Sequence, residues 1–300
     1  MIDGFLNINK PPGPSSHDIV RTLKQLLNKE FKHKIGHTGT LDPPASGILV
    51  IGIGRGNRLA EYVLKHPKEY TGKIKLGTGT ETLDSKGEIT ETKPVLSFSQ
   101  NDLDILAAEF TGKIIQVPPA ISALKKDGVK FYVHARRGNP VEPDPREAFV
   151  YNLTLEKSSD DEIELKVKCA SGFYVRSLAR DVARKLGTVG HLDKLVRISV
   201  GEFRIEESIT TEWIEQNGIE RTFNEKLLPL EFPLSLFPRI QLDDIEAGLF
   251  TRGMIRIIDD ETPPLDSDIA VFSKDRILGI GIIRLEDEKR LLKPRKVLVD

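Results

Sequence analysis

The sequence predicts an α+β protein. Strand and helix patterns follow one another irregularly, without the strand–helix–strand rhythm of a parallel α/β sheet. The clearest strand pattern is "EIELKVKCA", in which charged and apolar residues alternate from Glu162 to Cys169. Such alternation is typical of an antiparallel sheet that has one face in water. Beyond residue 239, several short strand patterns and one helix indicate a second, β-rich unit.

The first elements are predicted from the spacing of apolar residues. Gly4–Asn9 has the pattern of a short strand, and Ser15 or Ser16 can cap the helix that follows. The apolar face of that helix consists of Ile19, Val20, Leu23, Leu26 and Leu27. The run "GILVIGIG" at 47–54 is rich in β-branched residues, which favours a buried strand.

The middle of the chain shows one more strand and two helices. In "KEYTGKIKLG", alternate residues beginning with Tyr70 share one face, which favours a half-exposed strand. Helical patterns follow at about 100–110 and at about 177–186. Between them, the proline-rich stretch "GNPVEPDPRE" indicates an extended surface loop.

A second proline-rich stretch, "LLPLEFPLSLFPRIQL", is the best candidate for a domain boundary. A short helix near Asp243–Phe250 and a turn at Thr251–Gly253 are expected after it. We therefore expect two domains, residues 1–232 and residues 238–300. The second is small, but such a unit is stable when it docks on a larger domain.

The composition is that of an ordinary soluble protein. The chain has 300 residues, of which 39% are hydrophobic and 30% charged, and its net charge is −1. No apolar run reaches the ~18–20 residues that a membrane span needs, and we identify no signal-peptide pattern. The single cysteine excludes an internal disulfide. We therefore expect a cytoplasmic protein, in which any surface that binds nucleic acid is a local basic patch.

A loop around Asp42 is the first candidate site. The stretch "GHTGTLDPPASGILVIGIG" contains this one carboxylate, directly before the predicted buried strand. Because aspartate before proline is a common turn former, a structural role is one alternative. The glycines, however, allow a ligand to approach the backbone. A rigid loop that displays a single carboxylate suits a nucleophile or a general base.

The second candidate is the stretch "SGFYVRSLARDVARKLG". Arg176 lies beside Tyr174 at the start of the predicted helix, where its guanidinium can pair with a buried carboxylate. Arg180 and Arg184 follow at the spacing of one helical face. For these two arginines, an ordinary solvated helix face is an equally good interpretation.

The third candidate is the stretch "VPPAISALKKDGVKFYVHARRGNP". It mixes aromatic residues with basic ones, among them Lys125, Lys126 and Lys130. This mixture is typical of surfaces that contact phosphates and stack on the bases of RNA. A run of charges is also typical of a solvated surface, so the pattern alone is a weak signal.

Five stretches together resemble the TruB family of tRNA pseudouridine synthases, in the family's order. They are "NINKPPGPSSHDIV", the Asp42 stretch, "KEYTGKIKLGTGTETLDSKGEI", "QVPPAISALKKDGVKFYVHARRG" and "SGFYVRSLARDVARKLG". The resemblance implies a pseudouridine-synthase catalytic domain on a mixed, mainly antiparallel sheet. The pattern "GIGII…LLKPRKVLV" resembles the small, β-rich, PUA-like RNA-binding module that often follows this domain.

The resemblance also implies roles for single residues. Asp42 falls on the family's catalytic aspartate, Tyr70 on the tyrosine that stacks on the flipped uracil, and Arg176 on the arginine that pairs with the aspartate. Three substrate-binding positions are also implied. They are His37, which fills the space that the base leaves, Tyr174, a further tyrosine of the site, and Leu195, an apolar wall of the uracil pocket.

Other positions support the loop or depart from the family. Lys10 and Pro11 are expected to support the loop of Asp42. Ile121 stands where the family usually has tyrosine, and Phe173 where it commonly has threonine. We expect neither departure to touch the chemistry.

The reaction implied by the resemblance is the isomerisation of uridine 55 in the T-loop of tRNA to pseudouridine, after base flipping. No cofactor or metal is expected, since the sequence shows no Walker loop, dinucleotide fingerprint or metal-ligand cluster. The expected partner is the T-arm of tRNA, bound by a monomer without an obligate protein partner.

One alternative is a non-catalytic RNA-binding or tRNA-folding protein. A weaker alternative is an aspartyl-phosphate hydrolase. The sequence argues against it, because it shows no second carboxylate near Asp42.

Overall fold

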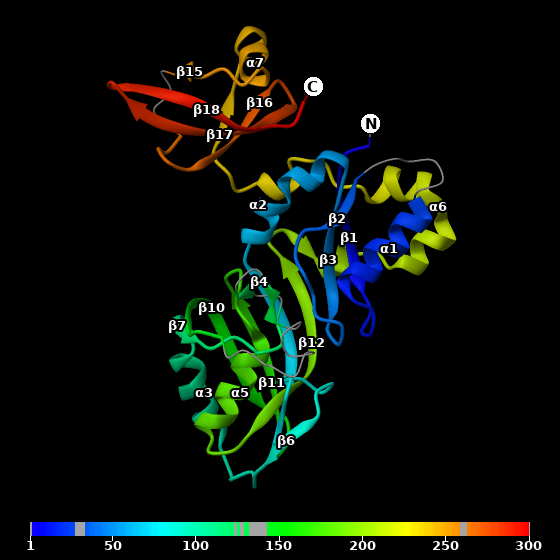
Figure 1. The fold of residues 1–300 in the computed structure, drawn as a ribbon, viewed down its shortest axis with the longest axis vertical. Coiled ribbons are helices and arrows are strands. Elements are labelled where there is room, and N and C mark those ends of the chain that lie inside the picture. The colour runs from blue at the N-terminus through cyan, green and yellow to red at the C-terminus, as the bar shows by residue number, and fades with distance from the viewer. Residues whose placement is uncertain are drawn as a thin grey trace.

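Two β-sheets and the helices that pack on them make up the fold (Figure 1). The computed structural model describes residues 2–27, 34–122, 131, 143–258 and 263–299, and of 125–126 and 129–130 it describes the backbone alone. Among the described residues, we find no helix with the length and apolar content of a membrane span.

The elements follow in chain order. The first are β1 (Gly4–Lys10), α1 (Ser16–Leu27), β2 (Ile35–His37), β3 (Ser46–Ile53), α2 (Ala60–Lys65), β4 (Lys68–Leu76), β5 (Thr78–Thr80), β6 (Ile89–Thr92), α3 (Gln100–Glu109) and β7 (Gly112–Gln116). Next come β8 (Lys125–Lys126), β9 (Val129–Lys130), β10 (Arg146–Lys157), β11 (Glu162–Cys169), α5 (Val175–Lys185), β12 (Gly190–Val200), β13 (Phe203–Arg204) and α6 (Thr211–Lys226). The last are β14 (Arg239–Gln241), α7 (Asp244–Thr251), β15 (Arg256–Ile257), β16 (Asp268–Ser273), β17 (Arg276–Glu286) and β18 (Lys289–Val297).

The larger sheet has the strand order β1-β3-β12-β4-β11-β10-β7, with β2 beside β3 and β13 beside β12. Its neighbouring strands pair antiparallel, except β3 and β12. These two strands pair in parallel over two residues each, Ser46 with Val196 and Gly47 with Arg197. This short contact joins the two halves of the sheet. The predicted α+β class with a mixed, mainly antiparallel sheet is confirmed.

Two groups of helices cover the sheet (Figure 1). α3 and α5 pack on the half that contains β4, β10 and β11, and α1 and α6 pack on the half that contains β1 and β3. Each group encloses a hydrophobic core. Tyr70 of β4 and Leu195 of β12 pack against both cores. These two side chains therefore lie between the halves of the fold, at the β3–β12 junction.

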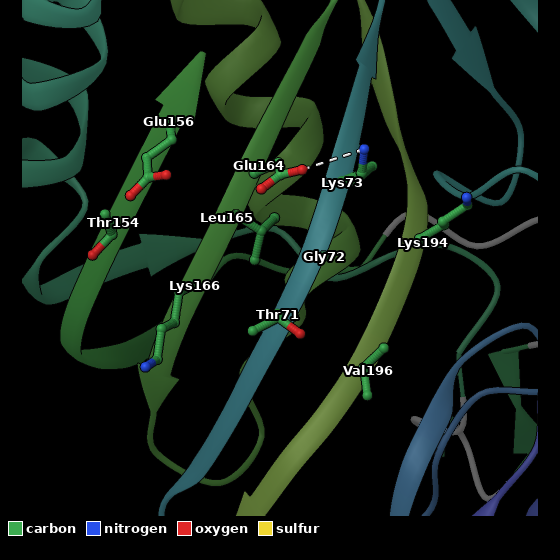
Figure 2. Close-up of a pocket in the computed structure, with 10 residues that line it drawn as sticks. All are labelled: Thr71, Gly72, Lys73, Thr154, Glu156, Glu164, Leu165, Lys166, Lys194 and Val196. Carbon is green, nitrogen blue, oxygen red and sulfur yellow. Dashed lines mark ion pairs between the residues drawn. The ribbon is translucent and has the colours of Figure 1, made fainter. Parts of the chain in front are cut away.

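The other face of β4, β10, β11 and β12 is open to water (Figure 2). A shallow hollow of about 410 Å³ on this face is lined mostly by charged and hydroxyl side chains. Figure 2 shows Lys73 and Glu164 as an ion pair across two strands, at 3.3 Å. The alternation predicted for Glu162–Cys169 is confirmed, because its apolar residues are buried and its charged residues lie on this face.

Two elements differ from the prediction. The sequence does not predict α6, because its partly buried apolar residues are interrupted at Gly218, whose φ is 76°. The helix is held by packing against α1 rather than by a continuous apolar stripe of its own. In the C-terminal part, β17 has 11 residues and is not one of the short strands that the sequence suggests.

The second sheet has the order β14-β16-β17-β18-β15. One hydrophobic cluster runs from the larger unit into this sheet and includes Phe5, Tyr62, Phe272 and Leu298. Lys296 of β18 forms an ion pair with Glu61 of α2. The C-terminal sheet is thus docked on the segment around α2 (Figure 1), and the boundary between residues 232 and 238 stays a prediction.

Gly47→Ala should destabilise the protein strongly. Gly47 has a φ of 99°, and a Cβ atom there would lie 2.3 Å from the backbone oxygen of Arg197. A side chain would therefore force β3 and β12 apart, and we expect the free energy of unfolding to fall by more than about 3 kcal/mol.

Gly112→Ala is the matched control, because Gly112 has a φ of 94° but no atom within 4 Å of the added Cβ. Its expected loss is about 1–2 kcal/mol. Denaturant unfolding followed by circular dichroism measures both variants. Equal losses would show that the φ angle alone, and not the close contact with Arg197, requires glycine at position 47.

Candidate active site

The loop between β2 and β3 carries Asp42, and buried groups hold it in place. On one side of Asp42, the Ser16 hydroxyl accepts a hydrogen bond from the Leu41 amide and donates one to the Leu41 carbonyl oxygen, each at 2.8 Å. On the other side, the Asp42 carbonyl oxygen accepts a hydrogen bond from the Ala45 amide at 3.1 Å. The loop therefore displays its carboxylate from a fixed backbone.

Lys10 lies beneath the same loop and is fully buried. Its ammonium donates to three carbonyl oxygens, those of Pro11, Pro14 and Pro43, at 2.8, 3.0 and 3.1 Å. Burial lowers the pKa of Lys10 to about 8, although the nearby negative charge of Asp42 acts to raise it. The structure thus places Lys10 against the residue that follows Asp42.

Arg176 connects Asp42 to a second carboxylate. One guanidinium nitrogen of Arg176 lies 2.8 Å from an Asp42 carboxylate oxygen, and the other lies 3.6 Å from a carboxylate oxygen of Asp84. The same guanidinium donates to the carbonyl oxygens of Thr82 at 2.8 Å and Ile121 at 3.3 Å. Arg176 is 7% exposed, so these contacts are held inside the protein, where charge-assisted hydrogen bonds are strong.

Asp84 was missed by sequence reasoning, and the expectation that Asp42 has no second carboxylate nearby is wrong. Asp84 is buried, and it also accepts hydrogen bonds from the Thr82 hydroxyl at 2.6 Å and the Lys86 amide at 3.0 Å. These bonds fix its carboxylate in a turn after β5. The available signal was the local pattern "TETLDSKG", which is typical of an aspartate that closes a turn.

A cavity of about 340 Å³ opens beside Asp42. Its walls bring together five of the predicted site residues, Asp42, Tyr70, Tyr174, Arg176 and Leu195. Among the lining residues that the structure describes, Asp42 is the only carboxylate, whereas four have cationic side chains, namely Lys68, Arg146, Arg176 and Arg197. The cavity is therefore positively charged around one acidic group.

The carboxylate of Asp42 is partly open to water in the free protein. The side chain of Asp42 is 38% exposed, whereas that of its partner Arg176 is 8% exposed. The carboxylate thus lies on the open side of the cavity. Only a bound molecule that covers the opening would remove this carboxylate from water.

Tyr70 forms another wall of the cavity from β4. Burial raises the pKa of its hydroxyl, while the charge of Arg197 and a hydrogen bond with Arg197 oppose the rise. The neutral phenol is therefore the form present near pH 7. Its half-buried ring and the neighbouring Leu195 offer apolar surface to a flat ligand.

Tyr174 is held by its backbone and by its ring. Its amide donates to the Gln116 side-chain oxygen at 2.9 Å, and its carbonyl oxygen accepts from the Gln116 side-chain nitrogen at 3.0 Å. The guanidinium of Arg146 lies over the ring, 4.9 Å from its centroid. Sequence reasoning missed both Gln116 and Arg146, since neither lies within the stretch around Tyr174.

The other predicted site residues lie elsewhere or outside the description. His37 ends β2 and does not line the cavity. Its Nδ1 atom is buried without a hydrogen-bond partner, and burial lowers the pKa of the ring. The side chains of Lys125, Lys126 and Lys130 fall outside the described residues. Within the described part of the chain, no three potential metal-ligating side chains gather in one place.

Comparison with known proteins decides the family. Residues 24–175 match the model of the TruB family pseudouridylate synthase N-terminal domain. A tRNA pseudouridine synthase B of Caldanaerobacter subterraneus is 37% identical over 298 residues, which are 99% of each chain. A protein with the same name from Bacillus cereus is 36% identical over 307 residues, covering 100% of this chain and 98% of its own. This chain belongs to the TruB family.

Solved structures support the same fold for this TruB-family chain. A Cbf5–Nop10–Gar1 complex contains a chain that is 25% identical, with a TM-score of 0.74. A chain in an H/ACA RNP bound to a substrate RNA that contains 2′-deoxyuridine is 24% identical, with a TM-score of 0.75. Each match covers 99% of this chain and 85% of the other. The whole TruB-family chain, including the C-terminal sheet, therefore has counterparts of known structure.

Two departures from the TruB pattern lie closer to the site than expected. The side chain of Phe173 lines the cavity, and the carbonyl oxygen of Ile121 accepts a hydrogen bond from Arg176 at 3.3 Å. Phe173 presents a larger apolar surface than threonine would. The contact at Ile121 uses the backbone, so it does not depend on the tyrosine that is common at this position.

Asp84→Asn should slow the reaction of this TruB-family protein without removing it. The amide keeps the shape of Asp84 but withdraws one negative charge from Arg176, which then pairs with Asp42 alone. We expect a loss of about 10- to 30-fold in the single-turnover rate, which is about 1.4–2 kcal/mol.

Asp181→Asn is the control, since Asp181 pairs with Arg180 on the same helix. Conversion of unmodified tRNA at saturating enzyme measures both variants. A rate for Asp84→Asn equal to that of the control would show that Asp84 has no influence on the Asp42–Arg176 pair.

Proposed function

We propose that this protein converts uridine 55 in the T-loop of tRNA to pseudouridine, with Asp42 as the catalytic carboxylate. The observation that carries this proposal is the ion pair between Asp42 and Arg176 at the wall of the cavity. It occurs in a TruB-family chain whose full-length relatives are named tRNA pseudouridine synthase B. The single acidic group among the described lining residues matches a reaction that needs one oriented carboxylate.

The reaction breaks the bond between N1 of the uracil and C1′ of the ribose and forms a bond from C5 to C1′. The proton of C5 is lost and N1 gains a proton, so the reaction needs no oxidant or reductant. Asp42 can attack C1′, attack C6 of the base, or assist a glycal intermediate, and the geometry of the free protein is compatible with each. All three routes require an oriented carboxylate, which the bond to Arg176 supplies.

The base has to leave its stack before it reaches the cavity, at a cost of a few kcal/mol. Stacking on an aromatic ring returns about 1–3 kcal/mol per base, and Tyr70 offers such a ring beside Asp42. Leu195, on the neighbouring strand β12, adds an apolar surface beside Tyr70. His37 lies outside the cavity at the end of β2, which suits a residue that occupies the gap in the RNA rather than contacts the flipped base.

We also infer that the T-arm is bound by a monomer, through the cationic rim of the cavity and the Lys125–Lys130 segment. The side chain of Arg146 lines the cavity, and its guanidinium lies over the ring of Tyr174. The C-terminal sheet of residues 239–297 would add contacts as a PUA-like module. Docking on α2 holds this sheet in a defined place relative to the site.

The direct test is to incubate the full chain with an unmodified tRNA transcript. Pseudouridine is mapped by stops of reverse transcription after carbodiimide treatment. We expect one new stop that reports position 55 and none in the same transcript with cytidine at that position. A non-catalytic RNA-binding protein would bind the transcript without producing the stop, and this result would refute the proposal.

Neutralising Lys125, Lys126 and Lys130 together should weaken tRNA binding and reduce its salt dependence. Each lost phosphate contact is expected to reduce the slope of log Kd against log salt concentration by about 0.7–0.9. Filter binding across a salt series measures the slope.

The control replaces Lys73, Lys75 and Lys166 of β4 and β11, on the open face of the sheet. These lysines do not line the cavity, so the control should bind tRNA as the wild-type protein does. The same slope for both triple variants would mean that the Lys125–Lys130 segment does not contact phosphates.

A further inference from the structure

We propose that Arg197 is a positioning residue of the reaction. It holds the loop of Asp42 and the side chain of Tyr70 in a fixed position relative to each other. The inference rests on the proposed function and concerns a residue that neither the motifs nor the family resemblance singled out. Arg197 lies on β12 and is 3% exposed. Its side chain lines the cavity but is held inside the protein, so it is not an ordinary surface arginine.

The guanidinium of Arg197 holds the loop through backbone carbonyl groups. Its Nη2 and Nη1 atoms donate to the carbonyl oxygens of Gly39 at 3.4 Å and Thr40 at 3.2 Å. Its Nε atom donates to the carbonyl oxygen of Ile48 at 2.8 Å, in β3. One planar group thus ties the start of the loop to the strand that follows it. Only arginine offers this rigid fork of donors.

The backbone of Arg197 is itself fixed at the junction of the two sheet halves. Arg197 pairs with Gly47 in the two-residue parallel contact between β3 and β12. The close approach of the two strands there leaves no space for a Cβ atom on Gly47. The guanidinium therefore starts from a rigid point and reaches across to the loop that begins on the other side of β3.

The same side chain contacts Tyr70. Arg197 and Tyr70 are direct neighbours across β12 and β4. Burial raises the pKa of the Tyr70 hydroxyl, and the charge of Arg197 and a hydrogen bond with it oppose this rise. Arg197 is thus in contact with two walls of one cavity, the loop of Asp42 and the ring beside it. A shift of the guanidinium would move the carboxylate and the ring relative to each other.

The chemistry of the site argues against a role in stability alone. Within the described part of the chain, Arg197 forms no ion pair with a carboxylate, so its buried charge is compensated by neutral carbonyl groups. Burying a charge in this way is costly, and a well-packed apolar residue often gives equal or greater stability. Burial lowers the pKa values of Lys10 and His37, and the charge of Arg197 adds to this effect.

The test compares Arg197→Lys and Arg197→Met with the wild-type full chain. The lysine variant keeps the charge but loses the fork, whereas the methionine variant loses both. For each variant we would measure the Kd for unmodified tRNA, the single-turnover rate of pseudouridine formation at saturating enzyme, and the Tm. Misplacement of a reacting group by about 1 Å can cost about 100-fold in rate. We therefore expect the rate to fall about 100-fold or more in both variants, with Kd within about threefold of the wild-type value.

Arg55→Lys is the matched control. Arg55 also carries a guanidinium that is mostly buried and bonded to a carbonyl oxygen, that of Leu298, and it pairs with Asp3 at 2.7 Å. It lies away from the cavity, so its substitution should lower the Tm and leave the rate at saturating enzyme unchanged. This control separates lost stability from lost positioning.

Three results would overturn the inference. The first is an unchanged rate in both Arg197 variants. The second is a loss of rate that weaker tRNA binding or a smaller folded fraction accounts for in full. The third is failure of both variants to fold, which would assign Arg197 to stability alone. Absence of conversion by the wild-type protein would instead refute the proposed function, and the inference with it. If the wild-type protein and the Arg55→Lys control convert the tRNA, the proposed function stands, and a negative result concerns the role of Arg197 alone.

Discussion

Asp42→Asn should abolish pseudouridine formation while the fold and tRNA binding are retained. The amide has the size of the carboxylate and can still accept a hydrogen bond from Arg176, so the loop keeps its shape. It has neither the negative charge of a nucleophile nor the basicity of a proton acceptor. We expect a single-turnover rate at least about 10⁴-fold below that of the wild-type protein, the scale seen when an essential catalytic group is removed.

Asp193→Asn is the control for this variant. Asp193 lines the crevice next to Asp42 but forms no ion pair with Arg176 among the described residues. The measurement is single-turnover conversion, with Kd from filter binding and Tm from circular dichroism. A substantial rate for Asp42→Asn would remove Asp42 from the proposed chemistry. A loss of tRNA binding that accounts for the whole rate defect would assign Asp42 to recognition instead.

Arg176→Lys should have the second-largest effect. The guanidinium of Arg176 binds Asp42, Asp84 and the carbonyl groups of Thr82 and Ile121 at the same time. A lysine ammonium is a single point and cannot reach all four acceptors with the geometry of a planar fork. Removing one partner of a buried charge pair costs about 2–5 kcal/mol. We therefore expect the rate to fall by about 10²–10³-fold.

Arg180→Lys, one helical turn further on, is the matched control for Arg176→Lys. Arg180 pairs with Asp181 at 2.8 Å and does not line the cavity. Both variants should bind tRNA with similar affinity, because neither residue is proposed to contact phosphate. Equal rates for the two lysine variants would place Arg176 on the ordinary arginine face that the helical spacing also allows.

Local patterns in the sequence were sufficient for several elements. The helix α1 and the strands β3 and β11 lie where the spacing of apolar residues predicts them. Helix and strand have different side-chain periods, so a complete apolar face reports both the element and its buried side. α6 has no such face, since Gly218 interrupts it and its packing against α1 supplies the stability.

The candidate site could be predicted in part. Asp42 stands out because it is alone in a glycine- and proline-rich loop, and Arg176 because it begins a helix next to an aromatic residue. Asp84 and Arg197 do not stand out, because one resembles a turn aspartate and the other a strand residue. Their contacts depend on where β12 and α5 lie relative to the loop, which no stretch around either residue encodes.

The sequence by itself determined the family, the α+β class and the residues that carry the proposed chemistry, because these are properties of continuous stretches. Only the tertiary structure decided that Arg176 binds two carboxylates and that Arg197 joins the loop of Asp42 to Tyr70. The reason lies in the parallel contact between β3 and β12, which spans two residues on each strand. So short a pairing leaves no periodic pattern of apolar residues in the sequence. It nevertheless sets the distance between the two halves of the sheet, and therefore how the side chains of the two halves lie relative to each other around the cavity.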